Sequence, residues 1–197
     1  MLKIQSPSPN FSENSTRKTT VVLHKTLGLM PGCLDWMENP QSQVSAHYLV
    51  TKKGEVYQLI DTRKVAWHAG RVYNPSNRAK NIMQKTSWGS YVNPNKYCIG
   101  IENEALINDK ITGKQLEANI LLIKDIIRDT YNDFDGDPDH IITHRDITSY
   151  KPNLELLRDA VIDGLQETPS NSNLLILDSW DQLKIEVKDK KIILYKK

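Results

Sequence analysis

Two short apolar runs that each end in a histidine constrain this chain more than any other feature. Residues 20–23 precede His24, and residues 141–143 precede His144. Each run is rich in β-branched residues and too short for a helix, so each predicts a buried strand. Histidines at the ends of two strands can meet at one edge of a sheet, and imidazole is a common zinc ligand. The pair therefore predicts a metal site in an α/β domain.

The rest of the chain supplies further strands and helices for such a domain. Strand-like runs occupy residues 46–50, 55–60 and 97–102. Apolar residues at three- and four-residue steps predict amphipathic helices over residues 116–131 and 154–165. Strands and helices that follow one another in this way favour an α/β fold with a central mixed β-sheet flanked by helices.

Two segments lack the periodicity of a helix or a strand. Residues 1–18 are rich in Ser, Pro, Asn and Thr, which predicts an extended arm. Residues 71–96 predict a long loop, and a loop of this length in a compact domain is usually functional or mobile. Trp88 and Tyr91 offer flat faces for a sugar, so we expect this loop to form the rim of a groove.

A change of composition near residue 168 predicts the end of the main domain. Pro, Ser and Asn dominate residues 169–173, which predicts a linker. Short apolar or alternating runs follow at residues 174–177, 183–187 and 192–195. We therefore predict a main domain over residues 1–167 and a linker with a small strand-rich extension over residues 168–197. Since a lone hairpin is marginally stable, the extension is expected to dock on the domain or on a partner.

Composition excludes several classes of protein. Lys and Arg number 26 and Asp and Glu 24, a balance that argues against a nucleic-acid partner. No stretch approaches the roughly 20 apolar residues that a membrane span needs.

Cys33 lies in a Gly/Pro-rich loop and Cys98 in an apolar run, so two free thiols and a reducing compartment are expected. Residues 1–10 show no apolar signal-peptide core, which predicts synthesis in a cytoplasm without a signal peptide.

Short stretches along most of the chain resemble those of one enzyme family, in the family's order. They are VVLHKT (21–26), VSAHYLV (44–50), GEVYQL (54–59), AWHAG (66–70), IGIE (99–102) and THRDI (143–147). The chain thereby resembles, over about residues 6–166, the zinc-dependent N-acetylmuramoyl-L-alanine amidases of the amidase-2 type. These are related to phage T7-type lysozyme and to peptidoglycan recognition proteins. The resemblance implies Zn2+ as cofactor and peptidoglycan or muropeptide as substrate.

The resemblance also implies the role of each matching residue. His24 and His144 match the two zinc histidines, and Glu102 matches the carboxylate that orients or deprotonates the attacking water. Lys151 matches the lysine that stabilises the oxyanion, a task suited to a fixed cation. The reaction implied is hydrolysis of the amide between N-acetylmuramic acid and the L-alanine of the stem peptide.

The segment formed by Trp67, His68 and Ala69 matches the part of the groove that contacts the muramyl-peptide. Its residues are equally compatible with a tryptophan in the core beside a hydrogen-bonded histidine. Both interpretations stay open at the level of the sequence.

The chain departs from the family pattern at the third zinc ligand. The family usually has Asp or Cys two residues after the lysine, whereas here Asn153 follows Lys151 and Pro152. An amide oxygen is neutral and is a weaker zinc donor than a carboxylate or a thiolate. Because the spacing from the lysine is kept, the resemblance implies Asn153 as the third ligand in an amidase. The alternative is a catalytically impaired peptidoglycan-binding module that has lost a full zinc site.

The biological setting is open at the level of the sequence. An endolysin-like phage enzyme, a toxin delivered to competitors and a cell-wall recycling enzyme all fit the absence of a readable signal peptide. The site of action is accordingly the cytoplasm, or the cell wall after release or delivery. No feature predicts an oligomeric state.

Overall fold

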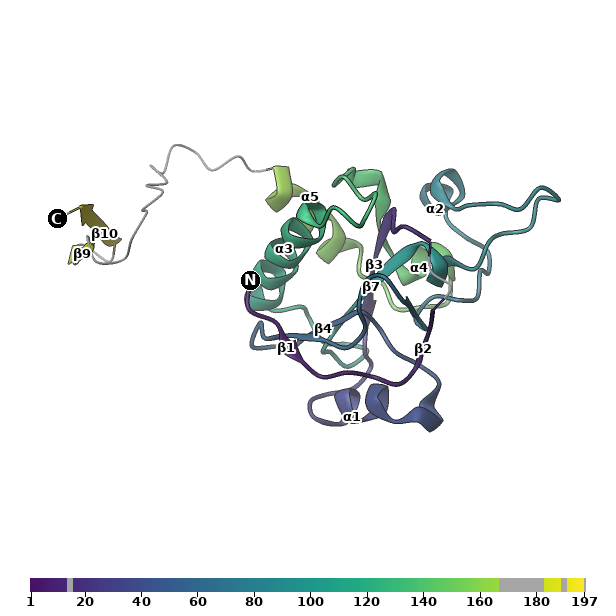
Figure 1. Ribbon diagram of the computed structural model, residues 1–197, viewed down its shortest axis with the longest axis horizontal. Helices are drawn as coiled ribbons and strands as arrows, with labels where there is room; N and C mark the ends of the chain where they lie inside the picture. The colour runs from purple at the N-terminus through teal and green to yellow at the C-terminus, as the bar shows by residue number, and fades with distance from the viewer. Residues whose placement is uncertain (14–15, 167–182, 189–190, 197) are drawn as a thin grey trace. The chain divides into compact units, whose positions relative to one another are not determined.

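The computed structural model describes residues 1–13, 16–166, 183–188 and 191–196 (Figure 1). By its internal contacts the chain divides into two compact units, Met1–Gln166 and Glu167–Lys197. The strands of the first unit are β1 (Ile4–Gln5), β2 (Phe11–Ser12), β3 (Thr20–Lys25), β4 (Tyr48–Val50), β5 (Val56–Gln58), β6 (Val65–Ala66), β7 (Cys98–Asn103) and β8 (Ile141–Thr143). Its α-helices are α1 (Gly32–Glu38), α2 (Asn77–Ile82), α3 (Gly113–Arg128), α4 (His144–Ile147) and α5 (Glu155–Gln166). Short 3-10 turns occupy η1 (Pro40–Ser42), η2 (Pro94–Lys96) and η3 (Pro138–His140).

A mixed β-sheet forms the centre of this unit, as predicted. Its strand order is β1-β5-β4-β7-β3-β8. Strands β4, β7, β3 and β8 run parallel to one another, whereas β5 is antiparallel to β4 and parallel to β1. The carboxyl ends of β7, β3 and β8 consequently lie side by side at one edge of the sheet.

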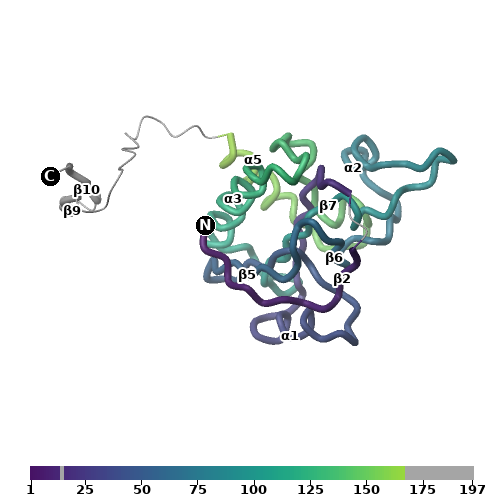
Figure 2. Tube along the Cα trace, in the orientation of Figure 1, coloured from purple at the N-terminus to yellow at the C-terminus, as the bar shows by residue number. Residues whose placement is uncertain are grey.

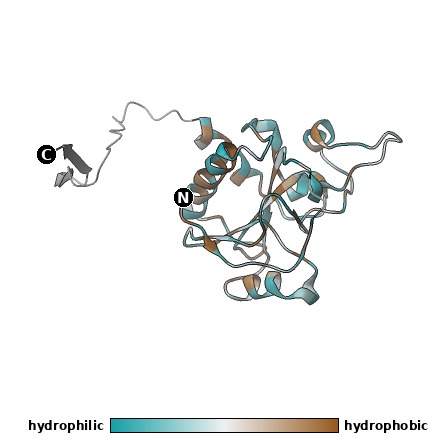
Figure 3. Cartoon of the chain, viewed as in Figure 1, coloured by the Kyte–Doolittle hydropathy of each residue, from teal (hydrophilic) through white to brown (hydrophobic). Residues whose placement is uncertain are grey.

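The alternation of side chains along β3 builds a separate core on each face of the sheet. Val21 and Leu23 belong to the core that α3 and α5 cover. Val22 belongs to the opposite core, which includes residues of α2 and α4. Figure 1 shows α3 and α5 side by side, and Figure 3 shows hydrophobic residues along α3. The two histidine-bearing strands are therefore buried on both faces, as a parallel sheet requires.

Helix α3 begins three residues before the position that periodicity predicted and ends before Tyr131. The reason is a capping box in which Thr112 Oγ1 accepts the backbone N–H of Gln115 and Gln115 Oε1 accepts that of Thr112. This reciprocal pair satisfies two N–H groups that the first helical turn leaves without partners. The apolar pattern indicated the helix, but the cap sets where it starts.

The prediction of an irregular loop over residues 71–96 was wrong for part of that segment. Residues Asn77–Ile82 form α2, whose first turn is capped by Ser76, with Oγ accepting the backbone N–H of Ala79. Ala79 is fully buried in the core beneath α2. A helix of six residues is too short to show a reliable periodic pattern, which is why the sequence suggested a loop.

The N-terminal arm is extended, as predicted, but it also adds strands to the fold. Ile4 pairs with Tyr57 of β5, and Phe11 pairs with Ala66 of β6. The trace in Figure 2 follows this arm along β5 and past β6. It thereby covers what would otherwise be an open edge of the sheet.

In the second unit, β9 (Leu183–Lys188) and β10 (Lys191–Lys196) pair as an antiparallel two-stranded sheet. Two of the three short apolar runs predicted for the extension are therefore strands. The third, over residues 174–177, lies outside the described residues. The predicted division between residues 167 and 168, and the docking of the extension, stay predictions.

Two further expectations concern the cysteines and the membrane. Cys33 and Cys98 are both free thiols, as predicted, and the structure buries both of them. In the described parts of the chain, no helix combines the length and the apolar composition needed to cross a membrane.

Candidate functional site

The parallel register of β7, β3 and β8 brings three polar residues to one edge of the sheet. His24 on β3 lies directly opposite Glu102 on β7. Leu23 lies opposite Thr143 on β8, so His144, which follows Thr143, emerges beside His24. We call His24, Glu102 and His144 the strand-end site. The sequence predicted each of these three residues.

The position of His144 is fixed by the start of a short helix. His144 is the first residue of α4, and Thr143 caps this helix through a reciprocal pair of hydrogen bonds with Asp146. Asp146 in turn accepts a hydrogen bond from Ser76 and forms an ion pair with Arg158. The carboxylate of Asp146 thus holds the backbone that carries His144 and does not itself enter the site.

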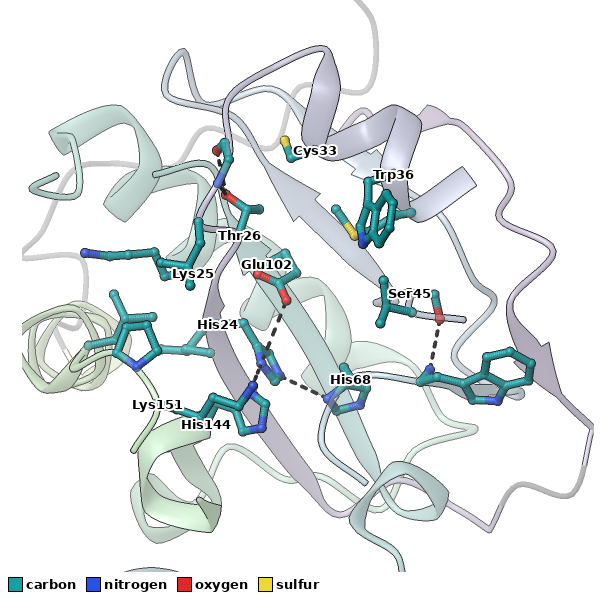
Figure 4. A pocket seen from close by; sticks show the side chains of 18 of the residues that line it. His24, Lys25, Thr26, Cys33, Trp36, Ser45, His68, Glu102, His144 and Lys151 are labelled. Carbon is teal, nitrogen blue, oxygen red and sulfur yellow. Dashed lines mark hydrogen bonds and ion pairs between the residues drawn. The ribbon is translucent and has the colours of Figure 1, made fainter. Parts of the chain in front are cut away.

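Both ring nitrogens of His24 have imidazole partners (Figure 4). His24 Nδ1 lies 2.9 Å from His144 Nδ1, and His24 Nε2 lies 3.0 Å from His68 Nδ1. Glu102 Oε1 is 3.9 Å from His24 Nδ1, on the same side as His144. The Nδ1 side of His24 therefore faces the other two members of the strand-end site, and its Nε2 side faces away from them.

Burial dominates the electrostatics of the strand-end site. It lowers the pKa of His24 well below its usual value, and nearby histidines and Lys151 lower it further. Burial and the positive charge of Lys151 lower the pKa of His144 to about 3. Burial raises the pKa of Glu102 to about 8, against the opposing effect of Lys151. Both imidazoles are thus neutral near pH 7, the form in which histidine binds a metal.

Two observations bear on whether this site suits a metal ion. The Nδ1 atoms of His24 and His144 lie 2.9 Å apart, and Glu102 Oε2 is buried without a hydrogen-bond partner. These features suit two ligands of a cation with a carboxylate beside it. Across the residues that the structure describes, however, no three or more His, Cys, Asp or Glu side chains are arranged to hold a metal ion. The strand-end site fits two of the three protein ligands of a catalytic zinc centre.

The expected third ligand, Asn153, lies elsewhere. Its exposed side chain accepts a hydrogen bond at Oδ1 from the backbone N–H of Glu155 at 2.7 Å, at the first residue of α5. Asn153 lines a shallow depression with Leu27 and Ile107 and is not among the residues that line the cleft beside the histidines. The structure therefore brings Lys151, but not Asn153, to the strand-end site.

A cleft of about 500 Å³ opens beside the strand-end site (Figure 4). Lys151, Trp67 and His68 line it together with the three site residues. Trp67 also donates a hydrogen bond from Nε1 to Ser12 Oγ. Ala69 is 1% exposed and its backbone N–H is bonded to Asn95 Oδ1. Of the predicted groove segment, the structure places Trp67 and His68 on the cleft and Ala69 beneath it.

The sequence named no individual residue on one wall of the cleft. Helix α1 contributes Cys33, Trp36 and Met37, and the Trp36 side chain is 58% exposed. Conversely, Trp88 and Tyr91, which we expected on a rim, are not among the cleft-lining residues. An available signal for Trp36 was its position in the long segment that follows His24, since functional side chains gather on such loops.

Comparisons with known proteins show what this chain is similar to. The chain resembles a curated relative, N-acetylmuramoyl-L-alanine amidase A of Achromobacter lyticus, with 40% identity over 63 residues. That match spans 32% of this chain and only 36% of the relative, about a third of its length.

Solved structures share the fold. One is AmiD from E. coli in complex with the substrate anhydro-N-acetylmuramic acid-L-Ala-D-gamma-Glu-L-Lys, with 26% identity and a TM-score of 0.55. That similarity covers 75% of this chain and 59% of AmiD. Another is PlyL, with 15% identity and a TM-score of 0.59 over 83% of this chain and 99% of PlyL. A third is AmpD, with 20% identity and a TM-score of 0.54 over 81% of this chain and 94% of AmpD.

The family itself follows from a match to most of the first unit. The sequence profile of the amidase-2 family, described as N-acetylmuramoyl-L-alanine amidase, matches residues 14–153. This span includes the strand-end site, the predicted groove segment (residues 67–69) and the segment from Lys151 to Asn153. The chain belongs to the amidase-2 family of N-acetylmuramoyl-L-alanine amidases.

Proposed function

We propose that this protein is a zinc-dependent N-acetylmuramoyl-L-alanine amidase that acts on peptidoglycan or muropeptides. The observation that carries the proposal is the convergence of His24 Nδ1 and His144 Nδ1, 2.9 Å apart, beside the buried carboxyl group of Glu102. Family membership and the cleft next to these residues support it. When bound, zinc would polarise the scissile carbonyl and lower the pKa of a water molecule.

The residues of this chain divide the remaining work. His24 and His144 would hold the metal, and the cleft would position the muramyl-peptide amide. Glu102, in its ionised form, would take the proton of the attacking water and deliver it to the leaving amine, which requires a carboxylate next to that water. Lys151 provides a positive charge where the carbonyl oxygen becomes negative, and such preorganised charge favours the transition state.

We propose Asn153 as the third ligand, which requires its side chain to move from the position it has in the structure. Its Oδ1 already accepts the backbone N–H of Glu155, so binding a metal requires this hydrogen bond to break. Zinc content by elemental analysis should therefore be compared between the wild type and Asn153→Asp. About one zinc per chain in both proteins is the expected result. Zinc in the variant alone would show that Asn153 does not serve as a ligand.

The hydrolytic activity is tested by the chemistry of the product. Purified protein loaded with zinc should release stem peptides that carry a new amino terminus at L-alanine, detected by mass spectrometry after amine labelling. The same protein treated with a chelator should release none. Peptidoglycan that stays intact with zinc-loaded protein would overturn the proposal.

A second candidate function is a peptidoglycan-binding module without hydrolysis. The displacement of Asn153 from the strand-end site favours it, because two histidines alone are one ligand short of a catalytic zinc centre. Co-sedimentation with peptidoglycan in the absence of zinc, together with no amine release in its presence, would select this function.

A further inference from the structure

We propose that His68 is a positioning residue for the metal site: its Nδ1 accepts the N–H of His24 Nε2 and thereby keeps His24 Nδ1 unprotonated and directed at His144. This inference rests on the proposed zinc site. It differs from the substrate contact that the sequence predicted for His68, because it places the residue behind His24 and not against the muramyl-peptide.

The geometry of the two rings carries the first step. His24 Nε2 and His68 Nδ1 are 3.0 Å apart, and the two ring planes are nearly perpendicular at 88°. A neutral imidazole has one nitrogen that donates and one that accepts. When Nε2 of His24 donates to His68, Nδ1 of His24 carries the lone pair, and it faces His144 Nδ1 at 2.9 Å. This is the tautomer that a metal between the two Nδ1 atoms needs.

The second step is that neither nitrogen of His68 is exposed to a ligand in the cleft. Nδ1 is engaged with His24, and Nε2 is buried with no hydrogen-bond partner in good geometry. His68 lines the cleft, but its Nδ1 is already bonded and its Nε2 is buried from solvent. A role in orienting His24 therefore uses the contact that the ring actually makes.

The third step is that the fold holds His68 firmly in place. Asn95 Oδ1 accepts the backbone N–H groups of both His68 and Ala69, at 3.2 and 2.7 Å. The carbonyl of Asn95 accepts a hydrogen bond from Lys18 Nζ, and Lys18 is fully buried. The chain segment that carries His68 is thus tied to the interior through η2.

A glycine on β7 completes this support. A side chain at Gly100 would place its Cβ 2.6 Å from Cγ of His68, well inside van der Waals contact. The imidazole of His68 therefore packs directly on the backbone of β7. Partners that orient a metal-binding histidine through its second nitrogen typically change metal affinity by about 10- to 100-fold when they are removed.

The test uses a matched pair of variants, His68→Asn and His68→Leu. Asn and Leu have nearly the same shape, but only Asn offers an oxygen that can accept the N–H of His24. Zinc affinity is measured by competition with a chromogenic chelator. We expect His68→Leu to bind zinc about 10- to 100-fold more weakly than the wild type and His68→Asn to stay within a few-fold of it. His140→Asn serves as the control, because His140 bonds the Thr19 carbonyl outside the cleft.

A measurement on the zinc-free wild type does not depend on any variant. Long-range 15N–1H NMR correlations should show the proton of neutral His24 on Nε2, and a proton on Nδ1 would overturn the inference. In His68→Leu the proton of His24 should redistribute between the two nitrogens, a change that a purely structural role of His68 would not cause.

The outcomes separate this inference from the proposed function. If the wild type binds no zinc, the proposed function fails, while the tautomer of His24 still tests the role of His68. If the wild type binds zinc and a folded His68→Leu binds it equally well, only the inference about His68 fails. Loss of muropeptide binding in His68→Leu with unchanged zinc affinity would assign the residue to substrate contact instead.

Discussion

The strand-end site and the segment from Lys151 to Asn153 were predicted from the same kind of motif. In the structure the residues of the strand-end site lie together, whereas Asn153 lies apart from them. His24 is 2% exposed, and both of its ring nitrogens are bonded within a network of histidines. Asn153 is exposed and is bonded to the backbone of the helix that follows it. The register of paired parallel strands therefore fixes where a side chain lies, whereas residue spacing in a loop does not.

The largest effect is expected at the strand end, from Glu102→Gln. This change keeps the shape of the side chain and removes its ability to take a proton. Hydrolysis should fall by about 100- to 10,000-fold, the usual contribution of a general acid–base. Zinc content and peptidoglycan binding should stay near wild type, which separates lost chemistry from lost structure. A rate equal to that of the wild type would remove Glu102 from the mechanism.

The next largest effect is expected on the loop side, from Lys151→Met. Methionine retains much of the length of the side chain without its charge. Loss of one group that stabilises an oxyanion typically lowers kcat by about 100- to 1,000-fold. Steady-state kinetics on a defined muropeptide should show this loss in kcat with a smaller change in KM. A change in KM alone would make Lys151 a substrate-binding residue, and the loop would then contribute no catalytic group.

A smaller effect, on stability, is expected from Gly100→Ala. The added methyl group must displace the ring of His68, and overpacking of a buried site costs about 1–3 kcal/mol. Urea unfolding measures this cost, and zinc affinity should fall along with it. Gly113→Ala is the matched control, because a Cβ at Gly113 meets no atom within 4 Å. Equal stability of the two variants would show that β7 and the ring of His68 are not tightly packed.

The smallest effect is expected from Asn153→Ala. The substitution removes the acceptor for the backbone N–H of Glu155, and a hydrogen bond of this kind contributes about 0.5–1.5 kcal/mol. Urea unfolding should show a loss of that size. Zinc content should fall as well, because Asn153 is the proposed third ligand; zinc retained at the wild-type level would remove Asn153 from the ligand set and leave it only its bond to Glu155.

The sequence predicted most of the strand-end site for a physical reason. The runs before His24 and His144 are continuous and apolar, so each had to be a buried strand, and Glu102 ends a third run of the same kind. Once these strands are parallel and adjacent, their carboxyl ends converge without further information. The mixed sheet and the two long helices followed from the same periodic patterns.

Other parts of the site could not be predicted because they depend on long-range contacts. The bond between His24 and His68 joins residues that are 44 positions apart and needs the absence of a side chain at Gly100. The placement of Trp36 on the cleft depends on how α1 packs beside the sheet. The orientation of Asn153 was set by a local backbone N–H, which competes with any distant partner for its side-chain oxygen.

The most direct test of the central claim is anomalous diffraction at the zinc edge from crystals of the zinc-loaded protein. The account predicts a peak at about 2.0–2.1 Å from Nδ1 of both His24 and His144, the usual distance of zinc from a histidine nitrogen. The same map would identify the third ligand. A zinc peak at other residues, or none between these two rings in fully loaded protein, would contradict the account.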